Sequence, residues 1–205
     1  MEAIPTAKES EKNPNKYFLV GGFCSGARFP NGNKCYDSFT GIKNAGSGYV
    51  EYNLNNQDLN FLDMLSVGLL YSKTRAECSN NAVLEGLQKQ LFEYQPTIII
   101  CHSLGCHLFE EYFRLGYPFP PSVKEIRYVQ ADVERVNNPV VKNLFSPFDP
   151  VLMLSNLVNF RLLCAGLIGD SSHPNNKTHH PDFLKRHTGV PPVDAHLDSL
   201  NSMKE

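Results

Sequence analysis

The sequence predicts one α/β domain, built on a mostly parallel central sheet with helices on both faces. Thr97–Ile100 is β-branched throughout, as expected of a central strand that is buried on both of its faces. Strand patterns and helical patterns alternate along the chain with short connections, which indicates parallel strands joined by helices. The chain has 205 residues, of which 41% are hydrophobic and 20% charged, enough for one substantial core. We therefore expect a flexible polar tail over residues 1–16 and a single domain over residues 17–205.

The first half of the chain contains two candidate strands and two candidate helices. The strands are Tyr17–Val20 and Tyr49–Leu54, and the helices are Leu59–Tyr71 and a segment from Ser79 or Asn80 to Tyr94. The first strand ends in the glycine turn Gly21-Gly22. Residues 27–48 are rich in Gly, Pro and Asn, which is typical of irregular structure. We expect the helix at Leu59–Tyr71 to break near Gly68.

The second half begins with the central strand and continues with further strand and helix patterns. After Ser103, apolar residues at helical spacing predict a helix that ends near Gly116. Two more strands are expected at residues 126–131 and 140–145, and a short last helix at Val193–Met203. The apolar stretch Val151–Gly169 fits a helix or a strand, and residues 170–192 are expected to form a long loop.

Charge and composition exclude several classes of function. A net charge of -2 gives no support for a nucleic-acid partner. No apolar run approaches the roughly 18 residues of a membrane span, and residues 1–16 lack the layout of a signal peptide. The six cysteines include no C-x-x-C pair, so we expect reduced thiols, a cytoplasmic location and no cofactor. The oligomeric state is left open.

One serine stands at the turn between the central strand and its helix. The segment Cys101-His102-Ser103-Leu104-Gly105 separates the strand period from the helix period. A serine on such a turn projects its hydroxyl away from the backbone. It also lies at a helix N-terminus, where free N–H groups and the helix dipole favour a developing oxyanion.

His102–Gly105, following a β-branched strand, resembles the nucleophile elbow of the α/β-hydrolase superfamily, whose usual pattern is G-x-S-x-G. Two other segments are similar to parts of that superfamily: Leu19–Phe23 resembles its oxyanion loop, and Phe148–Val151 resembles the acid turn of its lipases and esterases. The chain departs from the pattern at the first elbow position, where Cys101 replaces glycine. The resemblance implies an α/β-hydrolase fold with a minimal lid or none.

The resemblance also implies roles for individual residues. Ser103 would be the nucleophile, and the backbone N–H groups of Leu104 and of Phe23 or Gly22 would form the oxyanion hole. Asp149 is the expected acid, because it follows a candidate strand and opens a loop toward the histidine-rich end of the chain. Asp132 also follows a candidate strand and is the alternative acid.

The base must come from among seven histidines. His196 has the best context, since it lies where a loop runs into the expected last helix, and His180 is its rival. For the remaining five we expect structural or surface roles, namely His102, His107, His173, His179 and His187. The cluster of histidines over residues 179–187 has a spacing that matches no metal site, so no metal is expected.

These assignments predict a serine hydrolase that cleaves a carboxylic ester, either lipid-like or a small acyl ester, through an acyl-enzyme. The alternatives are a thioesterase or acyltransferase with the same triad, and a non-catalytic binding or regulatory protein of the same fold. Leu59–Tyr71 and Val151–Leu163 are candidates to contact an acyl chain, although ordinary core helices would show the same pattern.

Overall fold

The computed structural model of the chain describes residues 15–32, 39, 43, 48–54, 58–145, 156–157 and 164–178. Six parallel strands form one sheet in the order β2-β1-β3-β4-β5-β6. The strands are β1 (Lys16–Val20), β2 (Gly48–Tyr52), β3 (Ile98–His102), β4 (Glu125–Val129), β5 (Val141–Phe145) and β6 (Asn176–Thr178). The helices are α2 (Phe61–Leu65), α3 (Val67–Glu77), α4 (Asn81–Tyr94), α5 (Leu104–Arg114) and α7 (Ala165–Ile168).

The strand order reverses direction between the neighbouring strands β1 and β3. The chain leaves β1 toward β2 on one side and then returns to β3 on the other side, so the order reverses between β1 and β3. Val20 accordingly pairs with Tyr52 of β2 and with Cys101 of β3. In open α/β sheets the ligand crevice lies outside the carboxyl ends of the strands at such a reversal. The residues that follow β1 and β3 at this edge of the sheet are Gly21-Gly22 and Ser103.

The core explains why β3 consists of apolar residues without alternation. All five of its residues are buried, because both faces of this strand are covered. Ile99 and Cys101 belong to the larger core cluster, which also contains residues of α4 and α5, whereas Ile98 and Ile100 belong to a smaller cluster with Phe39 on the opposite face.

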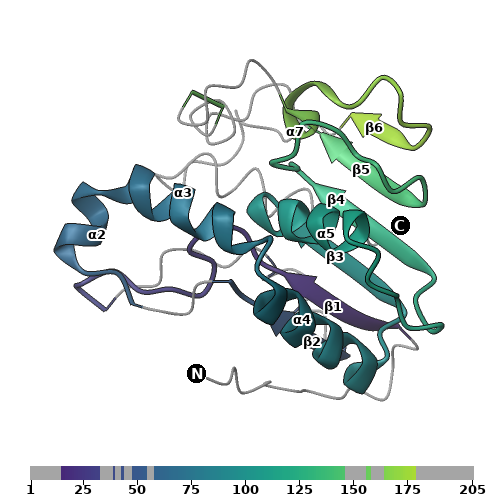
Figure 1. Cartoon of the computed structure of the whole chain (residues 1–205), viewed down its shortest axis with the longest axis horizontal. Helices are drawn as coiled ribbons and strands as arrows, with labels where there is room; N and C mark the ends of the chain where they lie inside the picture. The colour runs from purple at the N-terminus through teal and green to yellow at the C-terminus, as the bar shows by residue number, and fades with distance from the viewer. Residues whose placement is uncertain are drawn as a thin grey trace.

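Helices α4 and α5 lie side by side on one face of the sheet (Figure 1). Asn80 caps α4 by accepting a hydrogen bond from the Ala82 N–H at 2.9 Å, as the sequence predicts for one of its two candidates. Leu84, Leu87 and Leu91 then point into the core at helical spacing. The sequence also predicts helices on the other face of the sheet, and this part stays a prediction.

Helices α2 and α3 project beyond the carboxyl ends of the strands (Figure 1). They correspond to the helix expected over Leu59–Tyr71 with a break near Gly68: the break falls at Ser66, and α3 continues to Glu77. Asn60 and Asp63 form a reciprocal capping box that starts α2. Helical hydrogen bonding resumes from Ser66, the N-cap of α3, whose carbonyl accepts from the N–H of Leu70 at 3.0 Å.

One expected loop contains a strand. Residues 170–192 were predicted to be a loop from their Pro and Asn content, yet Asn176–Thr178 pairs with β5 as the edge strand β6. This prediction was wrong at that point because a three-residue edge strand takes its conformation from its neighbour rather than from its own pattern. The expected last helix at Val193–Met203 lies outside the described residues. In the described part of the chain, no helix combines the length and the apolar character needed to cross a bilayer.

Candidate active site

Ser103 occupies a strained turn between β3 and α5. Its backbone angles are φ 50° and ψ -117°, in a region that residues with a side chain rarely adopt. Three backbone hydrogen bonds hold it there: its N–H donates to the Val129 carbonyl at 3.0 Å, and its carbonyl accepts from the Asp132 N–H at 3.2 Å and from the Cys106 N–H of α5 at 3.0 Å. The strain is therefore imposed by the neighbouring strand β4 and the segment that follows it.

The Ser103 side chain does not perform the usual task of a serine at the start of a helix. It stands at the N-cap position of α5, where serine normally accepts a hydrogen bond from the first turn. Here the side chain makes no capping hydrogen bond. The residue is 8% exposed. Capping thus does not explain why a serine is held in this conformation.

Glycines allow the helix and β1 to meet at the elbow. A Cβ on Gly105 would lie 2.5 Å from the carbonyl oxygen of Val20 and 2.7 Å from that of Gly21. A Cβ on Gly21 would lie 2.2 Å from the Oδ1 atom of Asn53. Neither position can accept a larger residue without backbone movement. The glycine loop after β1 therefore starts directly against the first turn of α5.

The expected oxyanion donors lie on these two segments. Leu104 is the first residue of α5, and none of the described residues accepts a hydrogen bond from its backbone N–H. Phe23 lies in a tight turn, in which the Ser25 N–H donates to the Gly22 carbonyl at 3.1 Å. The Phe23 ring packs edge-on against Tyr71 of α3, with ring centroids 5.3 Å apart. The turn is thus held between β1 and α3.

Asp132, the alternative acid, lies beside the elbow and forms a buried ion pair. Its residue is fully buried, and its Oδ2 atom accepts a hydrogen bond from Nη1 of Arg75 at 3.1 Å. The same Nη1 atom donates to the Asp132 carbonyl at 3.0 Å. Nη2 of Arg75 lies 3.4 Å from Nδ1 of His107. The backbone N–H of Asp132 thus binds Ser103, while its carboxylate anchors α3 through Arg75.

Three histidines fall in the described residues, and each has a contact that suits a structural role. His102 is buried against Phe39, and burial lowers the pKa of its imidazole to about 3, so it is a neutral ring at ordinary pH. His173 is buried, and its Nε2 atom lies 2.6 Å from the Val141 carbonyl, at the amino end of β5 and away from the elbow. His107 of α5 is half-buried and contacts Arg75 of α3.

The two thiols that flank the serine are poor nucleophiles. Cys101 and Cys106 are fully buried, and burial raises the pKa of both thiols well above the ordinary value. Since the thiolate is the reactive form, both remain unreactive packing groups. The cysteine at the first elbow position is accommodated as a small side chain, as the sequence predicts.

Gln130 is a site residue that the sequence does not single out. It follows β4, has φ 49°, and is 1% exposed, and neither atom of its side-chain amide has a hydrogen-bond partner among the described residues. Buried amides are nearly always paired, so this group calls for a partner at the carboxyl edge of the sheet. Its only sequence signal is a polar residue near the end of the strand expected at residues 126–131.

The structure brings together the elbow serine, the glycine loop, the first turn of α5 and Asp132. It does not test the rest of the expected triad: Asp149, His196 and the alternative base His180 lie outside the described residues. Within those residues, no group of three or more His, Cys, Asp or Glu side chains is placed to hold a metal ion.

Comparison with models of known protein families finds none that matches this chain, and comparison with curated proteins finds no matching relative. The assignment of a function therefore depends on the geometry at Ser103.

Proposed function

We propose that this chain is a serine hydrolase of the α/β-hydrolase type that cleaves carboxylic esters. The observation that carries the proposal is Ser103 itself, a strained N-cap serine whose hydroxyl does not cap its helix. Strain of this kind costs about 1–3 kcal/mol and accumulates at functional sites. The location supports the same function, because the serine leaves the sheet beside the reversal between β1 and β3.

The proposed reaction proceeds in two steps. The Oγ atom of Ser103 attacks the ester carbonyl carbon while its proton passes to His196, which Asp149 orients. The N–H groups of Leu104 and Phe23 stabilise the tetrahedral oxyanion. The C–O bond to the alcohol then breaks, and the alcohol leaves with the proton from His196. Water, activated by the same histidine, next cleaves the acyl-enzyme and releases the acid.

Two carboxylates remain candidates for the acid. Asp132 is adjacent to Ser103, but its pairing with Arg75 already gives it a structural role. Asp149 precedes Pro150 in the segment that resembles the acid turn. Asp149→Asn separates the two: loss of turnover with a wild-type melting temperature identifies Asp149 as the acid, whereas retained turnover transfers the role to Asp132.

The proposed activity is tested with a fluorophosphonate probe and with short p-nitrophenyl esters. Ser103→Ala is expected to abolish both labelling and turnover, because no other group replaces the attacking oxygen. Ser72→Ala, which changes an exposed serine on α3, is the matched control and should retain both. Absence of labelling in the wild-type chain would instead favour a non-catalytic protein of this fold.

A further inference from the structure

Helix α2 and the first half of α3 carry an unusual concentration of exposed apolar side chains. The α2–α3 patch consists of Phe61, Leu62, Leu65, Val67 and Leu69, with exposed fractions of 67%, 71%, 71%, 49% and 75%. Exposed apolar residues elsewhere in the described part of the chain, such as Leu115 and Val140, are scattered. Single exposed apolar residues are ordinary, whereas a contiguous group marks a contact surface.

The patch stays exposed because other residues of α3 pack against the domain. Leu62, Leu65 and Leu69 follow one another at three- and four-residue intervals on either side of Ser66, where α2 ends and α3 begins, and all three are exposed. Leu70 packs against the small cluster of Cys24, Ala27 and Leu59, and Tyr71 packs against Phe23. The inner side of α3 is thus anchored to the domain, while the leucine side remains in solvent.

The patch and Ser103 belong to the same end of the molecule. Helices α2 and α3 extend past the carboxyl ends of the strands, the edge at which Ser103 leaves the sheet (Figure 1). Farther along α3, Tyr71 contacts the turn of Phe23, and Arg75 binds Asp132 next to Ser103. A surface that receives the patch would therefore come to lie near the proposed catalytic serine.

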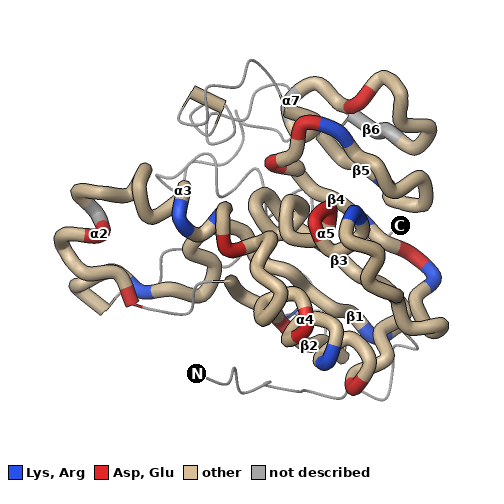
Figure 2. Tube along the Cα trace, in the orientation of Figure 1, with Lys and Arg blue, Asp and Glu red and all other residues tan. Residues whose placement is uncertain are grey.

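The charge of this region indicates the kind of surface. Asp63 is the only charged residue from position 59 to position 72, and the charged residues of α3, namely Lys73, Arg75 and Glu77, all lie in its later half (Figure 2). Helices that bind anionic membranes carry lysine and arginine beside their apolar side chains. A protruding patch of leucine, valine and phenylalanine side chains instead suits a neutral lipid surface. Apolar side chains can insert into such a surface without a groove of matching shape.

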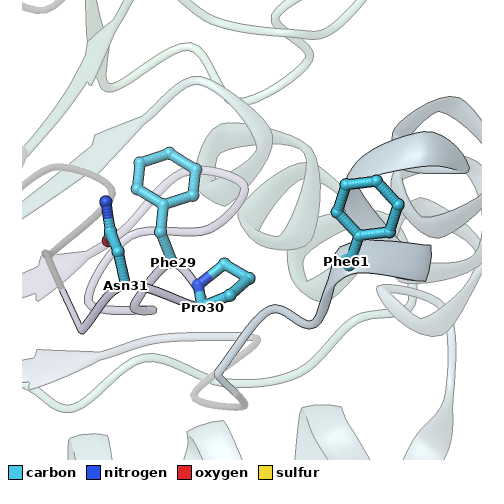
Figure 3. Close-up of a pocket in the computed structure, with 4 residues that line it drawn as sticks. All are labelled: Phe29, Pro30, Asn31 and Phe61. Carbon is cyan, nitrogen blue, oxygen red and sulfur yellow. The ribbon is translucent and has the colours of Figure 1, made fainter.

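A recess beside Phe61 of the patch is also lined mainly by apolar side chains. It has a volume of about 370 Å³ and is lined by Phe29, Pro30, Asn31 and Phe61, so that α2 and the loop after β1 both contribute (Figure 3). Three of its four lining side chains are apolar, which suits a hydrocarbon chain.

We propose that the α2–α3 patch docks the protein on a neutral lipid surface and presents the Ser103 edge to ester lipids in it. The inference rests on the proposed function for its substrate class, but binding itself requires no catalysis. Apolar insertion supplies the binding free energy, so added anionic lipid or added salt should leave binding unchanged.

The test measures flotation of the Ser103→Ala protein with phosphatidylcholine vesicles, so that hydrolysis plays no part. Leu62→Ser, Leu65→Ser and Leu69→Ser together should reduce partitioning by about tenfold or more, because three exposed leucines are lost. The matched control is Leu115→Ser, which alters an exposed leucine at the far end of α5 and should bind like the parent. Vesicles that also contain phosphatidylserine, and a salt series, should give the same partitioning.

The triple variant with Ser103 intact should keep its turnover of a short soluble ester and lose turnover of an ester carried in vesicles. Equal vesicle binding by the triple variant and its parent would overturn the proposal. So would a parent that ignores vesicles but forms a dimer that the triple variant does not form. Normal vesicle binding by a chain that lacks esterase activity would support the docking surface and reject the proposed function.

Discussion

At the residue scale, Ser103 combines a strained backbone with a side chain that makes no capping hydrogen bond. Its φ of 50° is maintained by hydrogen bonds to the carbonyl of Val129 and from the N–H of Asp132. A conformation of this type persists only where the surrounding structure determines it. Because the side chain contributes no capping hydrogen bond, a serine is not needed here for stability.

Ser103→Gly should therefore stabilise the fold by about 1 kcal/mol relative to Ser103→Ala, since glycine adopts positive φ without strain. Both variants lack the hydroxyl and should be inactive, so the comparison isolates the backbone. Urea unfolding followed by circular dichroism measures the difference. If the glycine variant were the less stable of the two, the backbone at this position would not be strained.

At the element scale, the ion pair between Arg75 and Asp132 fastens α3 to the carboxyl edge of the sheet. Asp132 is fully buried, and the Arg75 side chain is 18% exposed. A buried carboxylate that loses a paired cation is destabilising, because its charge stays in the interior with less compensation than the ion pair gave it. The pair thus couples the position of α3, and of the apolar patch on it, to the segment beside Ser103.

Arg75→Met should lower the free energy of unfolding by about 3 kcal/mol. Lys142→Met is the matched control, because it removes an exposed lysine that lies 3.0 Å from Glu125, and it should cost less than about 1 kcal/mol. Denaturant melts of the two variants provide the measurement. The double variant Arg75→Met/Asp132→Leu should recover part of the loss, and a double variant no better than Arg75→Met would show that the isolated charge is not the cause.

At the scale of the whole molecule, burial of His102 ties the stability of the fold to pH. Its pKa is about 3 in the folded chain, against about 6.5 for an unfolded histidine. Between these values the unfolded chain binds a proton that the folded chain does not. The contribution of His102 to stability is therefore fully present above about pH 6.5 and is lost as the pH falls toward 3. The buried carboxyl of Glu110 has a raised pKa and acts in the opposite direction.

Comparison of the wild-type chain with His102→Leu separates this contribution from that of Glu110. The difference between their unfolding free energies should change by about 1.4 kcal/mol per pH unit between pH 6 and pH 4, and should be constant above about pH 7. Urea melts at a series of pH values give this difference. A difference that does not vary with pH would mean that the pKa of His102 is the same in the folded and the unfolded chain.

The sequence by itself determined the features that depend on local pattern. The β-branched run predicted the buried central strand, Asn80 predicted a helix start, and His102–Gly105 predicted a tight turn with a serine at its apex; the structure confirms all three. Each follows from the periodicity, capping chemistry or glycine content of a few consecutive residues. The assignments of Asp149 and His196 stay predictions.

Only the tertiary structure decided which distant residues meet and which apolar residues remain exposed. Arg75 and Asp132 are far apart in the sequence, and no local pattern predicts their ion pair. The leucines of Leu59–Tyr71 have the same spacing whether a helix is buried or exposed, and the structure places Leu62, Leu65 and Leu69 in solvent. The physical reason is that periodicity defines a face of a helix, whereas burial depends on what the rest of the chain packs against that face.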